Sequence, residues 1–211
     1  FLLNRARLYS FMPGEQVKVL DDPPTPPLQA LYTFESKVNA WADMLADDGV
    51  QKMVNLGTCR PDWKSPNPAF GEHSLDLGDG FRPWNRVEIH GTRNLGRHFT
   101  LAAMVKIKRQ HQLARLFSSY RGKGTFGTSE LVFDFDPEGK VINGLRLICK
   151  GIKVESAKLE FTDREYHHLA VTYDDGEVTF YFDGEPAGRE YIPGGDPVVL
   201  DRNLLVGEDA Q

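Results

Sequence analysis

The chain has 211 residues, of which 40% are hydrophobic and 26% are charged, a balance typical of globular domains that excludes a wholly disordered, collagenous or coiled-coil chain. Its formal net charge of −5 leaves no positive excess to neutralise phosphates, so nucleic acid and anionic membranes are not expected as partners. No apolar run approaches the roughly 18 residues that a bilayer span requires, so membrane insertion is not expected either.

The N-terminal part of the chain predicts an arm followed by a stiff linker. Residues 1–20 hold short apolar runs around a Pro13-Gly14 turn signal, and prolines then crowd residues 21–27. Prolines remove backbone donors and favour extended geometry, so we place a domain boundary at this linker. The first segment is then either the tail of an upstream domain or an N-terminal arm packed on the main domain, which spans residues 28–211.

The main domain opens with a strand and a helix. Residues 28–34 are a strand candidate. Residues 36–48 predict one short helix, because Trp41, Met44 and Leu45 fall on one face at helical spacing.

Later segments predict strands joined by tight turns. Apolar residues recur at period two in residues 99–107 and 131–135, which is typical of half-buried strands. The dipeptides Asp175-Gly176 and Asp183-Gly184 lie between apolar runs and mark hairpins. Together these signals predict an all-β fold, an antiparallel two-sheet jelly-roll sandwich with one short helix and the N-terminal arm.

Residue types that carry metal or nucleophilic chemistry are sparse. Cys59 and Cys149 are too few for a disulfide scaffold or a tetrahedral zinc site, and their spacing leaves open either one long-range disulfide or two unpaired thiols. The adjacent His167 and His168 would point to opposite faces of a strand. We therefore expect one of these histidines to be packed and hydrogen-bonded in the sandwich rather than to bind a metal.

One acidic cluster can be compared with the sites of glycosidases, which need two carboxylates flanking one sugar bond. Asp134, Asp136 and Glu138 would share a face if their strand continued. Pro137 and Gly139 predict instead that the chain turns there, and acidic residues are common in solvated turns. We therefore name no catalytic residue and expect the domain not to be an enzyme.

Aromatic side chains in loops are the ligand-binding candidates. Trp63, Trp84, Tyr120 and Phe126 lie among glycines and prolines, where exposed rings could stack on sugar faces. The alternative is that each ring plugs an end of the sandwich, since aromatic residues bury large areas.

Several segments in order resemble a laminin G-like domain of the concanavalin A-like lectin/glucanase superfamily. Residues 71–80, 86–89 and 99–107 resemble its first half. Residues 166–174 and 178–186 are similar to the family's hairpin of an aromatic-x-His strand followed by an aromatic-x-Asp-Gly turn, with Tyr166 where Trp is usual. The resemblance covers roughly residues 28–208 and implies the same sandwich fold.

The resemblance also implies a calcium site at the rim of the sandwich, built from two acids and backbone carbonyls. Asp163 matches the position of one acid, and Glu130 is the nearest candidate for the other. The alternative is that Asp163 caps its own turn. Family members also have a closing strand after the segment that matches residues 203–207, and this sequence stops soon after that segment. We expect either that the sequence is a fragment or that another chain or the N-terminal arm covers an open sheet edge.

The resemblance implies a non-catalytic module that binds carbohydrate or protein ligands within a larger secreted or cell-envelope protein. Residues 12–19 resemble the tail of bacterial FecR-type sensor domains, and the chain opens at Phe1 without Met, so we expect a processed piece of a bacterial multidomain protein. One alternative is a structural assembly module completed by strand exchange with a partner chain. A less favoured one is a glycan-cleaving enzyme.

Overall fold

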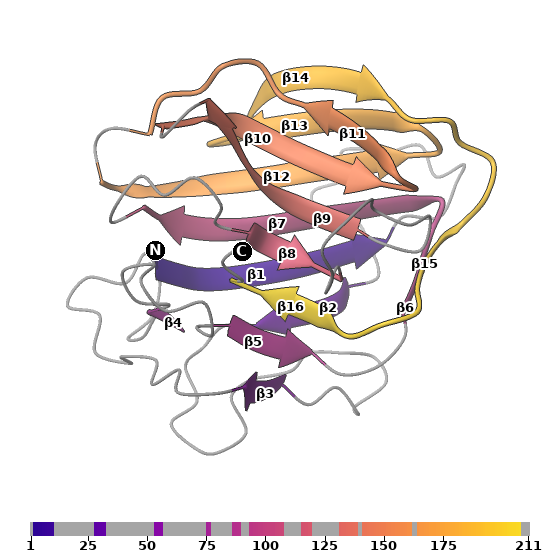
Figure 1. The fold of residues 1–211 in the computed structure, drawn as a ribbon, viewed down its shortest axis with the longest axis horizontal. Helices are drawn as coiled ribbons and strands as arrows, with labels where there is room; N and C mark the ends of the chain where they lie inside the picture. The colour runs from indigo at the N-terminus through magenta and orange to yellow at the C-terminus, as the bar shows by residue number, and fades with distance from the viewer. Residues whose placement is uncertain are drawn as a thin grey trace, which may run out of the picture.

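The computed structural model describes a β-rich body. It describes residues 2–10, 28–32, 53–56, 75–76, 86–89, 93–107, 115–119, 131–138, 141–161 and 164–207. Side chains are described within residues 94–107, 115–119, 131–135, 143–161 and 164–207. Every regular element in these ranges is a β-strand, which confirms the predicted all-β class (Figure 1).

The first sheet has seven strands, all paired antiparallel. Its main path runs through β14 (Glu185–Tyr191), β13 (Glu177–Phe182), β12 (Tyr166–Asp174), β7 (His98–Lys106), β1 (Leu2–Ser10) and β2 (Leu28–Tyr32), and β4 (Leu75–Asp76) pairs with β1.

The second sheet also has seven antiparallel strands and packs against the first (Figure 1). Its order is β11 (Ile152–Glu155), β10 (Val141–Cys149), β9 (Leu131–Glu138), β8 (Arg115–Ser118), β16 (Leu204–Val206), β5 (Arg86–Ile89) and β3 (Met53–Leu56). A small two-stranded ribbon of β6 (Arg93–Gly96) and β15 (Val198–Leu200) completes the described elements. This arrangement confirms the antiparallel two-sheet sandwich.

The core follows from the period-two pattern. Phe99 and Leu101 of β7 and Phe133 of β9 are fully buried between the sheets. Phe99 stacks on Tyr173 at 5.1 Å between ring centroids, and Phe117 stacks on Phe133 at 6.3 Å. Each such side chain contributes about 1.5–3 kcal/mol through burial, so these rows of alternate residues hold the two sheets together.

Strand β1 lies inside the first sheet. It pairs with β7 over most of its length and with β2 on its other side. The residues between these two strands, 11–27, lie outside the described part of the chain, as does the predicted helix at residues 36–48. The domain boundary and the helix therefore stay predictions.

Strand β9 corrects one expectation. The chain was expected to turn at Pro137, but β9 continues to Glu138 and pairs Pro137 with Ile142 of β10. On its other side, β9 pairs with β8 only from Val132 to Asp134. The missing N–H of Pro137 therefore breaks no ladder with β8, which is the setting in which a strand tolerates proline.

Cys149 is a fully buried free thiol at the end of β10. Burial raises its pKa to about 12. Of the two alternatives that the sequence left open for Cys149, the structure has the unpaired thiol. The described residues include no helix of the length and hydropathy that crossing a bilayer would require.

Candidate ligand-binding site at the rim of the sandwich

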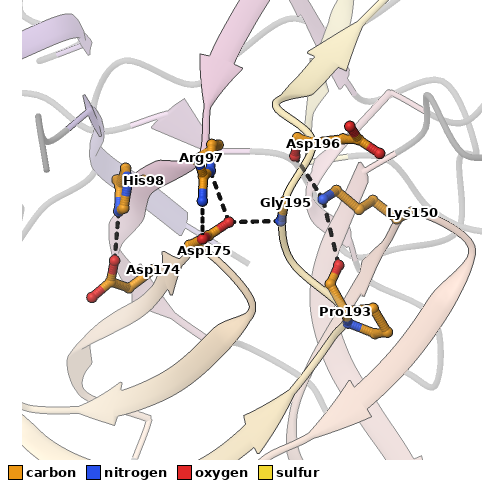
Figure 2. Close-up of polar contacts among 8 residues, drawn as sticks. All are labelled: Arg97, His98, Lys150, Asp174, Asp175, Pro193, Gly195 and Asp196. Atoms are coloured by element: carbon orange, nitrogen blue, oxygen red, sulfur yellow. Dashed lines mark hydrogen bonds and ion pairs between the residues drawn. The ribbon is translucent and has the colours of Figure 1, made fainter.

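Four chain segments meet at one end of the sandwich. They are the junction of β6 and β7, the turn between β10 and β11, the turn between β12 and β13, and the loop from β14 to β15. We call the polar residues that join them the rim cluster, and Figure 2 shows them together. They are Arg97, His98, Lys150, Asp174, Asp175, Pro193, Gly195 and Asp196.

The two-residue turn between β12 and β13 places the central carboxylate of the cluster. Asp175 and Gly176 have φ angles of 43° and 113°, and a two-residue hairpin turn favours residues that tolerate positive φ. The backbone N–H of Asp175 donates to the carbonyl oxygen of Arg97 at 2.7 Å. The turn is thus tied to the start of β7, and the side chain of Asp175 lies beside that of Arg97.

Asp175 accepts hydrogen bonds from two segments. Nε of Arg97 donates to Oδ1 at 2.9 Å, and Nη2 of Arg97 contacts Oδ2. The backbone N–H of Gly195 also donates to Oδ1, at 2.7 Å (Figure 2). The Arg97 guanidinium, with help from the Gly195 N–H, holds the pKa of Asp175 well below its ordinary value. The carboxylate thereby fixes the β14–β15 loop to the first sheet.

Lys150 holds the same loop from the second sheet. Its ammonium donates to the carbonyl oxygen of Asp196 at 2.6 Å and contacts that of Pro193 at 3.5 Å. The same ammonium lies 5.5 Å from the centre of the Tyr173 ring, within cation–π range. The β14–β15 loop is therefore held from both sheets at once.

A histidine and an acid extend the cluster along the edge of the first sheet. Nδ1 of His98 lies 2.5 Å from Oδ1 of Asp174, which is its direct partner across β7 and β12. The His98 side chain is 14% exposed and that of Asp174 is 73% exposed. The pair therefore presents an acidic side chain to solvent beside the turn.

One exposed aromatic ring stands next to the rim cluster. Tyr191 ends β14, directly before the loop that Asp175 and Lys150 hold, and its side chain is 65% exposed. It faces Glu177 across the β13–β14 ladder. Sequence reasoning missed Tyr191, since a tyrosine at the end of an ordinary strand carries no local signal of exposure.

The expected histidine role is confirmed. Nδ1 of His167 lies 2.7 Å from Oδ2 of Asp183, and the His167 ring stacks on Phe182 with centroids 4.7 Å apart. Oδ1 of Asp183 accepts from the backbone N–H of His168 at 2.8 Å. One histidine of the pair is thus packed and hydrogen-bonded.

Asp134 of the acidic cluster is buried in an ion pair. Arg146 donates from Nε to Oδ1 at 2.8 Å and from Nη2 to Oδ2 at 2.7 Å, and Asp134 is only 2% exposed. A carboxylate held in this way on the outer side of β9 is a structural group of the second sheet.

The site residues predicted from sequence lie outside the described part of the chain. These are the calcium candidates Asp163 and Glu130 and the aromatic candidates Trp63, Trp84, Tyr120 and Phe126. The described residues nearest to Asp163 in the chain are Phe161 and Arg164. Phe161 is buried against Phe135, and Arg164 has a φ of 59°. All six candidates therefore stay predictions.

The sequence of the chain matches the model of a known protein family. A family model described as the concanavalin A-like lectin/glucanases superfamily matches residues 85–211, and no curated protein matches the chain. Similar solved structures include the carbohydrate recognition domain of Emp47p, with a TM-score of 0.38 and 14% identity over 59% of this chain and 69% of that one.

Two further solved structures show likeness at the same level. Domain 4 of AbnA, an extracellular arabinanase of Geobacillus stearothermophilus, has a TM-score of 0.34 and 14% identity over 59% of this chain and 68% of that one. A glycosyl hydrolase family protein of Mycobacterium fortuitum has a TM-score of 0.30 and 16% identity over 75% of this chain and 81% of that one. Because all three TM-scores are low, the function of the chain is inferred from the family match and from the site residues alone.

Proposed function

The chain belongs to the concanavalin A-like lectin/glucanases superfamily, and from this membership we propose that it is a non-catalytic carbohydrate-binding module. The observation that carries the proposal is the family match over residues 85–211. These residues include the second-half strands and all the turns that form the rim cluster. We further propose that the module serves a larger secreted or cell-envelope protein.

Binding is favoured over catalysis by the state of the carboxylates. A glycosidase needs two acids that are free to reach one sugar bond. Two aspartates of the described chain are held by arginines, Asp134 by Arg146 and Asp175 by Arg97. Asp134, the one acid of the predicted trio whose side chain is described, is committed to the sheet.

The assembly alternative receives no support at the β14 edge. The backbone N–H of Ala157 already donates to the carbonyl oxygen of Ala187 at 2.7 Å, and the ladder with β13 is irregular between Phe180 and Tyr181. Pro186 and the charged Arg189 also lie on this strand. Proline, charge and irregular pairing are common ways to prevent a further strand from adding to an edge.

Calcium is a second part of the proposal. Asp163, with Glu130 as second acid, would supply carboxylate oxygens to the ion, and neighbouring backbone carbonyls would complete its shell. Bound calcium would hold the carboxylate that precedes β12 in the chain and so stabilise the folded domain.

A glycan array tests the proposed function. The purified chain is screened with and without calcium. The control is the same chain unfolded in urea, which is diluted and screened under conditions that prevent refolding. We expect binding to one structural class of glycan by the folded chain only. Silence of the folded chain across the array in both conditions would contradict the proposal and favour protein ligands.

A further inference from the structure

Three large apolar residues are exposed in segments that border the rim cluster. Among residues with described side chains they are Ile152, Tyr191 and Val199, which are 37%, 65% and 44% exposed. Tyr191 directly precedes the β14–β15 loop, Val199 follows it in β15, and Ile152 begins β11 two residues after Lys150, which holds the loop. Single exposed apolar residues are ordinary, but these three belong to segments that converge on one loop.

The Tyr191 ring is exposed but has a packing contact on one side. A Cβ atom added to Gly176 would lie 2.8 Å from Cε2 of Tyr191, so the ring rests directly against the glycine backbone. The next residue, Ile192, is fully buried, and its N–H donates to the carbonyl oxygen of Gly176 at 2.8 Å. A ring positioned in this way loses little conformational entropy when a ligand stacks on it.

The charges beside the ring are paired. Nε of Arg189 lies 3.4 Å from Oε1 of Glu177, and the two side chains are 69% and 49% exposed. Arg189 and Tyr191 are two positions apart on β14, and Glu177 is the direct cross-strand partner of Tyr191. The surface therefore offers donors and acceptors to solvent while its charges are balanced.

We propose that Tyr191 is the stacking surface for one pyranose ring of an uncharged glycan, with Glu177 and Arg189 bonding its hydroxyl groups. An aromatic face suits the C–H face of a sugar, and balanced polar groups suit hydroxyls better than a carboxylate or sulfate, which would need an unpaired cation. This inference rests on the proposed function, since it assigns a place and a ligand class to the same binding activity.

The test compares variants on soluble neutral gluco-, xylo- and galacto-oligosaccharides, whose sugars are pyranoses, by titration calorimetry. We expect Tyr191→Ala to weaken binding about tenfold or more, because the variant removes the apolar surface that the sugar would cover. Tyr191→Phe keeps the ring and should retain most of the affinity. Tyr181→Ala removes a half-buried tyrosine from the same sheet and serves as the matched control, with the melting temperature of each variant measured alongside.

The outcomes separate the inference from the proposed function. If the wild type binds a neutral oligosaccharide and Tyr191→Ala binds it equally well, the inference is wrong and the binding function stands. If the wild type binds only acidic glycans, the ligand class is wrong. If sedimentation shows that the wild type is a dimer and that Tyr191→Ala is a monomer, the ring contacts a second copy of the chain and the inference is overturned. If the wild type binds no glycan at all, the proposed function itself fails.

Discussion

Arg97 and Asp175 are 78 positions apart in the chain, yet Nε of Arg97 donates to Oδ1 of Asp175 at 2.9 Å. This contact joins the start of β7 to the β12–β13 turn, and the Gly195 N–H adds the β14–β15 loop to the same carboxylate. Lys150 holds that loop from the opposite sheet. The surface on which we place the ligand is therefore ordered by ion pairs and hydrogen bonds that close the end of the sandwich.

Asp175→Asn should make the stability of the protein less sensitive to low pH. The pKa of Asp175 is lowered in the folded state, so its stabilising effect is complete above the unfolded value near 3.8 and fades as the pH falls below it. Asparagine tolerates the positive φ of this position, so the variant removes charge and leaves the turn intact. We expect the variant to melt at a lower temperature than the wild type at pH 7, and we expect the difference between the two melting temperatures to shrink below about pH 4. Melting curves that stay parallel from pH 7 to pH 2 would contradict this assignment.

Asp134→Ala should destabilise the protein by about 3 kcal/mol, because it leaves the Arg146 guanidinium without its buried partner. The double variant Asp134→Leu/Arg146→Met removes both charges and should lose less, as apolar replacements of buried pairs often do. Urea unfolding measures both. A single variant that keeps wild-type stability but loses an activity on glycans would instead assign Asp134 to the enzyme alternative.

Gly176→Ala should cost more stability than Gly184→Ala. Both glycines follow an aspartate in a two-residue hairpin turn and have positive φ, 113° and 89°, so both variants carry backbone strain of about 1–2 kcal/mol. Only at Gly176 would the new Cβ lie 2.5 Å from the Ile192 carbonyl oxygen and 2.8 Å from the Tyr191 ring, whereas Gly184 has nothing within 4 Å. Thermal unfolding compares the two, and equal losses would show that the turn relaxes around the methyl group.

Cys149 should resist thiol reagents until the protein unfolds. The thiol is fully buried, and a pKa raised to about 12 leaves roughly one thiolate in ten thousand at pH 8. In a Cys59→Ser variant, so that only one thiol is counted, we expect negligible labelling of the native chain and complete labelling in urea. Stoichiometric labelling within minutes in native buffer would mean that the end of β10 opens readily.

Calcium, if bound through Asp163, should raise the melting temperature. We expect a chelator to lower the melting temperature of the wild type by several degrees and to leave Asp163→Ala unchanged, because that variant lacks the carboxylate that holds the ion. Glu130→Gln tests the second acid in the same assay. An identical curve for the wild type with chelator and with added calcium would remove calcium from the proposal.

The sequence alone determined the class of fold, because its signals are local. The alternation of Phe99 and Leu101 with polar or small neighbours has the period of a strand, and Asp175-Gly176 has the φ preferences of a two-residue turn. The prediction of a turn at Pro137 was wrong because it also used local signals alone. A proline has no N–H to donate, but a strand tolerates it where one side of the strand has no pairing partner, and the local sequence does not show which partners a strand has.

Only the tertiary structure decided what the rim contains. That β1 lies beside β7, that Arg97 meets Asp175, and that Lys150 reaches the Asp196 carbonyl all depend on pairings between residues far apart in the chain. The exposure of Tyr191 is decided in the same way, since it depends on how other segments pack around the ring and not on a property of tyrosine itself. Local preferences thus fix how each segment is built, while long-range packing fixes which side chains share a surface and remain open to a ligand.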